Sequence, residues 1–309
     1  MLVKILGTAA GGGFPQWNCA CANCSRLRSG TFAGKARSQL QIAVSANGLD
    51  WFLLNASPDI RFQIERSQFL QPKNRVRSSP IQGVVLTSAE IDQSLGALLL
   101  REFQPLQIYA TAGVAAVLRA DNSMFSMLQR DACQGNWNEI SPGALFQLSN
   151  VSGKETGICC LPITTSSRYP QYVTSRRKAE LDPSHASLGL TLKSETGRQL
   201  GFFPAINEVT DSILQHLDSV DVLLLDGTFW SNDELIKLRG TGETAREMGH
   251  LPIGGRDGSL ALLSKLECRR KLFVHINNTN PMLDESGPEY RAVKEAGWEV
   301  AEDGWELKL

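Results

Sequence analysis

Hydrophobic residues in this chain gather in short runs, separated by polar or helix-like stretches. Runs of roughly four to eight residues rich in β-branched and aromatic side chains are typical of β-strands. Asn47-Gly48 between two alternating runs predicts a hairpin, and Asp303-Gly304 predicts a closing hairpin near the C-terminal end. Strands are expected at 2–9, 38–46, 50–56, 83–87, 107–111, 157–163, 187–194, 198–204, 220–226 and 271–276. Helices are expected at 90–103, 112–120, 208–218 and 259–266.

Strands and helices alternate through both halves of the chain, with a weaker pattern at 121–156. Many strands with helices between them predict an α/β fold of the α+β sandwich type, two sheets flanked by helices. We find no sequence repeat, low-complexity tract or long linker, so we expect one domain over residues 1–309. The polar, proline-containing segment 164–186 predicts an exposed loop near or over a functional site.

Composition narrows the classes of partner and compartment. The chain has 309 residues, 42% of them hydrophobic, and a formal net charge of -1, which argues against a nucleic-acid or membrane-surface partner recruited by bulk charge. No apolar run is long enough for a membrane span. The apolar stretch at the N-terminus is very short and contains a lysine, so it predicts a first strand rather than a signal peptide. We expect a cytoplasmic protein.

A dense group of cysteines follows a glycine-rich turn near the N-terminus. Cys19, Cys21 and Cys24 form a C-x-C-x2-C loop, and clustered thiolates suit zinc, which favours tetrahedral sulfur and nitrogen ligands. Such a site is structural when a fourth protein ligand closes it. The alternatives are reduced thiols or a redox pair. The seven cysteines are an odd number, which favours reduced thiols. Small core residues are expected at Cys133, Cys159, Cys160 and Cys268.

Acidic residues and histidines follow three predicted strands. Glu90 and Asp92 lie at a strand-to-helix junction, Asp226 ends a very hydrophobic strand, and His275 ends another before a polar run. His250 follows a glycine-rich loop. Functional side chains gather at strand ends in layered α/β proteins, so these five are candidate metal ligands or proton-transfer groups. Asp92 has the alternative role of a helix cap and Asp226 that of a turn residue.

Five segments carry a resemblance to a known family. They are GTAAGGGFPQWNCACANC (7–24), LLNASPDIR (53–61), LLLDGTFW (223–230), REMGH (246–250) and FVHINNTNP (273–281). Their order and spacing resemble the coenzyme PQQ synthesis protein B family over nearly the whole chain. The resemblance implies the metallo-β-lactamase fold, two mixed β-sheets packed face to face with helices outside. It also implies zinc and a role in biosynthesis of pyrroloquinoline quinone, a redox cofactor made from a glutamate and a tyrosine of a precursor peptide.

The chain departs from the metal-binding pattern of that fold. Hydrolases of the fold carry H-x-H-x-D-H, and the matching positions here are Ser88, Glu90, Asp92 and Gln93. B-family proteins usually keep the last histidine, where this chain has Gln93, and the later aspartate expected after RQLGFF is also absent. The resemblance therefore leaves Asp92 and His275 as metal ligands. A di-zinc hydrolytic centre is not expected.

By the same resemblance, a single iron(II) or similar ion would be held by Asp92, His275 and Glu90. His250 and Asp226 would then transfer protons or orient groups. The roles proposed for the family include iron-dependent hydroxylation of a tyrosine-derived intermediate and movement of the product or precursor. We expect participation in pyrroloquinoline quinone biosynthesis, through an oxidative step on an amino-acid-derived intermediate or PQQ precursor.

Three questions stay open at this point. One alternative function is a non-catalytic binding or carrier protein, and another is a divergent hydrolase or oxygenase of a different small-molecule pathway. A homodimer is also left open. In the phosphodiesterase relatives that the fold resembles, a histidine three positions after the last catalytic histidine completes the cysteine site, and the matching residue here is Asn278. The fourth ligand is therefore Asn278 by that resemblance, His275 itself, or an acid that the sequence does not identify.

Overall fold

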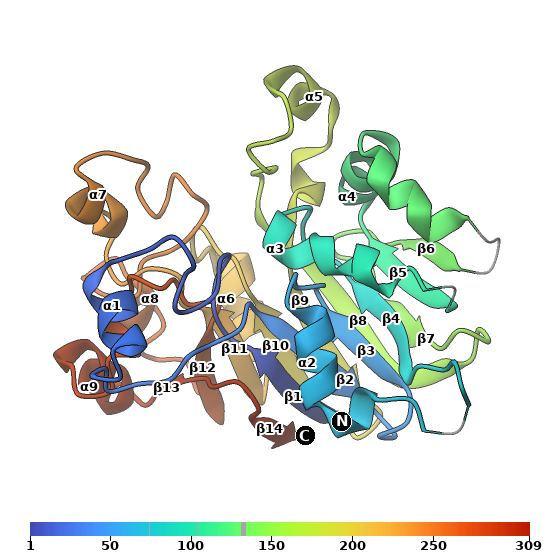
Figure 1. The fold of residues 1–309 in the computed structure, drawn as a ribbon, viewed down its shortest axis with the longest axis horizontal. Coiled ribbons are helices and arrows are strands. Elements are labelled where there is room, and N and C mark those ends of the chain that lie inside the picture. The colour runs from blue at the N-terminus through green and yellow to red at the C-terminus, as the bar shows by residue number, and fades with distance from the viewer. Residues whose placement is uncertain (74, 103, 131–133) are drawn as a thin grey trace.

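Two β-sheets of seven strands each form the centre of the described part of the chain (Figure 1). The computed structural model describes residues 1–309 except 74, 103 and 131–133. The first sheet runs in the order β14 (Glu306–Lys308), β1 (Leu2–Gly7), β2 (Gln41–Ser45), β3 (Trp51–Leu54), β4 (Ile81–Val85), β5 (Leu106–Ala110) and β6 (Gly135–Glu139). The second runs β13 (Glu299–Val300), β12 (Arg270–Val274), β11 (Val222–Asp226), β10 (Gln199–Phe203), β9 (Ser187–Ser194), β8 (Glu155–Ser166) and β7 (Phe146–Ser149). Both sheets mix parallel and antiparallel pairs, as predicted.

Short helices cover the outer faces of both sheets. On the first sheet lie α2 (Ile60–Arg66), α3 (Ile91–Ser94) and α4 (Ala112–Ala115), and on the second α1 (Ala22–Arg28), α6 (Asp211–Asp218), α8 (Ser259–Leu262) and α9 (Pro288–Glu295) (Figure 1). The remaining helices are α5 (Ser175–Glu180) and α7 (Glu234–Arg239). Shorter 3-10 and π turns are η1 (Gln68–Leu70), η2 (Leu95–Leu100), η3 (Ala116–Ala120), η4 (Ser123–Gln129), η5 (Pro183–His185) and η6 (Pro281–Leu283). Among the described residues, no helix has the length and apolar character that crossing a membrane requires.

The core lies between the sheets and under the helices. Phe52 and Leu54 of β3 pack between the sheets, whereas Trp51 and Leu53 pack under the helices of the first sheet. All four residues are buried, which explains why this strand reads as a continuous apolar run instead of an alternating one. Cys160 and Cys268 are buried, as expected; Cys159 is partly exposed, and Cys133 lies outside the described residues.

Two sequence-based expectations need correction. The predicted closing hairpin at Asp303-Gly304 is wrong, because β13 joins the second sheet beside β12 and β14 joins the first sheet beside β1. The turn therefore carries the chain from one sheet to the other. The segment 164–186 is not simply an exposed loop, since it begins within β8, contains α5 and η5, and buries Tyr169 and Val173 in the core under the first sheet's helices.

The sheets approach each other at one edge, where several strand ends meet. The strands β10, β11 and β12 are parallel, so their carboxyl ends lie at the same edge. Isolated bridges connect the two sheets there, Ala9 with Ile276 and Ser88 with Ser187. The loops that follow β1, β4, β11 and β12 are thereby brought together, and with the loop after α7, which carries His250, they hold the candidate residues.

Candidate metal centres

The three cysteines of the N-terminal loop converge on one side chain from a distant segment. The carboxamide nitrogen of Asn278, in the loop after β12, lies 3.2, 3.6 and 3.3 Å from the Sγ atoms of Cys19, Cys21 and Cys24. Asn23 fixes this loop by donating to the backbone carbonyl of Asn278 at 3.1 Å. Asn278 thus lies where a fourth ligand would complete a tetrahedron with the three sulfurs.

The electrostatics of the cluster favour a bound cation. Burial first, and then the side chains of Cys19 and Cys24, raise the pKa of the Cys21 thiol to about 11 against the lowering effect of a hydrogen bond from the Cys24 backbone. Burial also opposes ionisation of Cys19, but hydrogen bonds, first of all from the Cys21 backbone N–H, outweigh it and lower the pKa of that thiol. Three packed sulfurs cannot all ionise without a positive charge among them.

A cavity of about 580 Å³ opens at the edge where the strand ends meet. Its lining includes the candidates Glu90, Asp92, His250 and His275. Four residues of the segment predicted to lie near a site also line it: Ser166, Arg168, Gln171 and Tyr172. A larger groove of about 690 Å³ lies against β1 and α2. The side-chain chemistry favours the smaller cavity as the functional site. There, potential metal-binding atoms of Asp226, His250 and His275 lie within 4.8 Å of one another.

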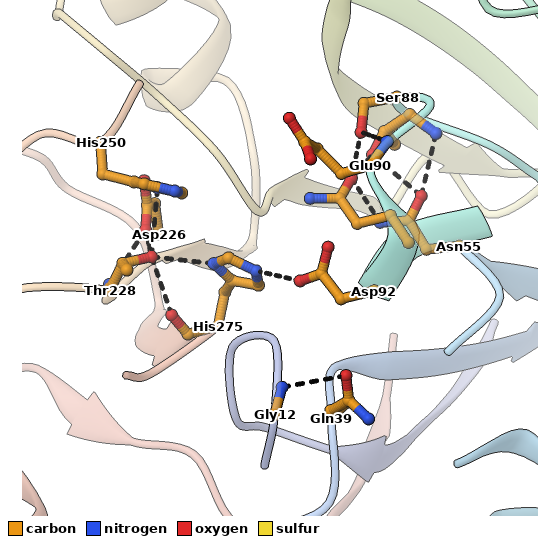
Figure 2. A network of polar contacts seen from close by, with 12 residues as sticks. Gly12, Gln39, Asn55, Ser88, Glu90, Asp92, Asp226, Thr228, His250 and His275 are labelled. Atoms are coloured by element: carbon orange, nitrogen blue, oxygen red, sulfur yellow. Dashed lines mark hydrogen bonds and ion pairs between the residues drawn. The ribbon is translucent and has the colours of Figure 1, made fainter. Parts of the chain in front are cut away.

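Asp92 and His275 contact each other across this cavity (Figure 2). The Oδ2 atom of Asp92 lies 2.9 Å from Nε2 of His275. Burial alone would raise the pKa of Asp92 and lower that of His275, but their contact outweighs it, so the pKa of Asp92 is lowered and that of His275 raised. Asp92 is not the helix cap considered above, because the cap position of α3 is Glu90.

Thr228 fixes the tautomer of His275. The Thr228 hydroxyl has one hydrogen, which it donates to Oδ1 of Asp226 at 2.6 Å. Nδ1 of His275 lies 2.8 Å from the same hydroxyl oxygen and must therefore be the donor of that contact. Nε2 is then the atom that loses its proton: it donates to Asp92 while the ring is protonated, and it can bind a metal once that proton is lost. His275 has a φ of 55°, an uncommon value for a residue with a side chain.

Asp226 and His250 form a second pair beside the first. Oδ2 of Asp226 lies 2.7 Å from Nδ1 of His250, and the two histidine rings stack with centroids 5.3 Å apart. Burial tends to raise the pKa of Asp226, but His250 outweighs it and the net shift is downward. Asp226 also accepts the Thr228 N–H at 3.0 Å, so it stabilises its own turn as well as orienting a histidine.

Glu90 projects from the start of α3 toward the side of the cavity where His250 lies (Figure 2). Burial, and after it the charge of Asp92, raises its pKa. A nearby cation would stabilise the ionised form of a buried carboxyl group in such a position.

The whole chain is similar to proteins of known family. Residues 50–276 match the model of a beta-lactamase superfamily domain. Coenzyme PQQ synthesis protein B of Nitrosococcus oceani is 40% identical, with 100% of each chain covered. The crystal structure of Zn(2+)-bound PqqB from Methylobacterium extorquens is 36% identical over 100% of both chains, with a TM-score of 0.90. This chain belongs to the coenzyme PQQ synthesis protein B family.

Membership of the coenzyme PQQ synthesis protein B family confirms the fold class predicted from the sequence. A diphosphatase from the PhnP family has a TM-score of 0.66 at 18% identity, over 100% of this chain and 97% of that one. At that identity the likeness extends to the fold only.

The sequence predicted the candidate ligands that meet in these two places, but it did not predict the residues whose hydrogen bonds position them. The cysteines and Asn278 meet in one cluster, whereas His275 faces Thr228 and Asp92 and is separate from it. Thr228 was missed, although a threonine two residues after a strand-ending aspartate is a signal for such a contact. Asn55 was also missed; it is buried and has a φ of 65°.

Proposed function

We propose that this protein takes part in pyrroloquinoline quinone biosynthesis by oxidising an amino-acid-derived intermediate at a one-metal site, with a separate structural zinc. Family membership supports the pathway. The observation that carries the chemistry is the Asp92–His275 pair, 2.9 Å apart in a cavity large enough for a small molecule. The tautomer of His275 leaves its Nε2 atom for a metal.

The structural zinc is proposed at the cysteine cluster. Soft sulfur donors suit zinc, and the relative from Methylobacterium extorquens is a zinc-bound protein. Asn278 faces the sulfurs with its nitrogen, and rotating its carboxamide by half a turn would present the oxygen as the fourth ligand. With that ligand the site is closed, as structural zinc sites are.

The active-site metal is proposed at Asp92 and His275, with Glu90 as a third ligand. Two carboxylates and one imidazole suit a divalent ion such as iron(II), which would supply the redox chemistry of hydroxylation. Dioxygen and an external reductant balance that reaction. Because Asp226 occupies Nδ1 of His250, the opposite ring nitrogen Nε2 is left for exchanging a proton with a bound molecule.

The proposed reaction is tested with iron(II)-loaded protein, a glutamyl-tyrosine dipeptide, dioxygen and ascorbate. We expect mass spectrometry to show a product that has gained one oxygen atom. The Asp92→Asn variant should form none while keeping its zinc. Failure of the iron-loaded protein to convert this dipeptide or its oxidised derivatives would contradict the proposal, and binding of them without conversion would favour a non-catalytic binding role.

A further inference from the structure

A buried hydrogen-bond network beside the cavity fixes the orientation of an amide side chain. Oδ1 of Asn55 accepts the backbone N–H of Thr87 at 2.9 Å. A backbone N–H can only donate, so the carboxamide of Asn55 has one possible orientation. Its nitrogen then points to Gln93, whose Oε1 it reaches at 3.2 Å. Figure 2 shows this network around Asn55 and Ser88.

In the same network the side-chain oxygen of Gln93 accepts hydrogen bonds, whereas its side-chain nitrogen makes none with the described residues. Besides Asn55, the hydroxyls of Thr87 and Ser88 lie 2.9 and 3.0 Å from Oε1 of Gln93. The side chain is 3% exposed and lines the cavity. Among the described residues, no acceptor lies within hydrogen-bond distance of its Nε2. This nitrogen is not one of the fully buried side-chain atoms that lack a partner, so it is open to the cavity and can donate to whatever the cavity holds.

We propose that Gln93 is a specificity-determining residue that donates a hydrogen bond to a carboxylate of the bound small molecule. The inference rests on the proposed function, since it assigns the substrate class of the same site. Gln93 and Asp92 line the same cavity, so the carboxylate would lie in the space that also holds the proposed metal. Arg168 lines the same cavity; its Nη2 pairs with Glu243 at 3.0 Å, and its other N–H groups are donors of the kind that carboxylates favour.

The geometry also says why Gln93 is not a metal ligand. To bind a metal, its carboxamide would have to turn and present Oε1 to the cavity. Its nitrogen would then face the nitrogen of Asn55, and two donors would oppose each other in a buried position. Asn55 cannot turn in response, because the Thr87 N–H holds its oxygen.

The test is calorimetric binding to the zinc-loaded protein, with 4-hydroxyphenylacetate as the carboxylate probe and 2-(4-hydroxyphenyl)ethanol as its neutral counterpart. Gln93→Ala should weaken the carboxylate about tenfold, because a hydrogen bond to a charged group is lost. The alcohol should change less than about twofold. Gln39→Ala is the matched control, since Gln39 lines the cavity but already uses its oxygen on Gly12 and its nitrogen on Asp59.

Equal effects of Gln93→Ala on both probes, or none, would overturn the inference. Gln93→Glu keeps the side-chain shape and the oxygen that accepts from Asn55, so it replaces the alanine variant if that variant does not fold. Its negative charge should weaken binding of the carboxylate probe and leave binding of the alcohol unchanged. Metal content is measured on each variant. If the cavity binds no metal, the proposed oxidation is refuted, but the difference between the two probes still tests the role of Gln93. If the metal content is normal and Gln93→Ala affects both probes equally, only the role of Gln93 is refuted.

Discussion

The cysteine cluster and the cavity differ in how completely the protein surrounds them. At the cluster, the side chain of Asn278 fills the fourth position against three sulfurs. At the cavity, Asp92 and His275 meet at 2.9 Å beside about 580 Å³ of open space. A closed set of soft donors is suited to holding structure, and an open set of hard donors is suited to binding a reactant.

One loop serves both regions. His275 and Asn278 are three residues apart after β12, yet one faces the cavity and the other the cysteines. The N-terminal loop is therefore tied to the segment that positions the candidate metal ligand His275. The proposed zinc site and the cavity are expected to be structurally coupled but chemically separate.

The largest effect is expected at the closed site. Cys21→Ser removes a zinc ligand, and structural zinc contributes folding free energy, so the free energy of unfolding should fall by about 4 kcal/mol. Chemical denaturation with zinc analysis measures this. Cys268→Ser is the matched control, because a serine there keeps the hydrogen bond to the Val220 carbonyl. Normal stability with full zinc content in Cys21→Ser would refute a structural zinc.

A substitution in the cavity should lower metal affinity more than it lowers stability. Asp92→Asn removes the carboxylate that faces His275, and we expect affinity for the second metal to fall by more than about 100-fold. Zinc at the cysteines should stay near normal, as metal analysis would show, and melting curves should record only the loss of stability that comes from neutralising one partner of the Asp92–His275 pair. Loss of the cysteine-bound zinc in this variant would contradict two separate sites.

A smaller effect is expected from the residue that orients both histidines. Thr228→Val keeps the shape but removes the hydroxyl that contacts Asp226 and Nδ1 of His275. Outer groups of this kind typically change metal affinity by about 10- to 100-fold. Iron(II) titration measures the change, and Thr279→Val is a control, since Thr279 bonds Glu234 instead. Unaltered affinity would show that His275 does not depend on Thr228.

The smallest effect is expected from restoring the histidine of the motif. Gln93→His should raise iron(II) affinity by about tenfold or less, because the imidazole adds a ligand but disturbs the contact with Asn55. Competitive titration against a chelator would detect this gain. A fall in affinity would mean that Gln93 already contributes to the metal.

The sequence predicted what depends on short-range pattern and local chemistry. The apolar runs located most strands, and the cysteine spacing located one site, because both signals lie within a few residues. The sheet switch between β13 and β14 was not predictable, since a turn does not say which strands its flanks pair with. The orientation of Gln93 was also hidden, because it depends on a backbone N–H of Thr87 that acts through Asn55.

Anomalous diffraction from crystals loaded with zinc and iron(II) tests the existence of two unlike metal sites most directly. The account predicts zinc at about 2.3 Å from the sulfurs of Cys19, Cys21 and Cys24, and iron bound by Asp92 and His275. A disulfide among those cysteines with no ion between them, or no metal at Asp92 and His275 at saturating iron(II), would contradict it.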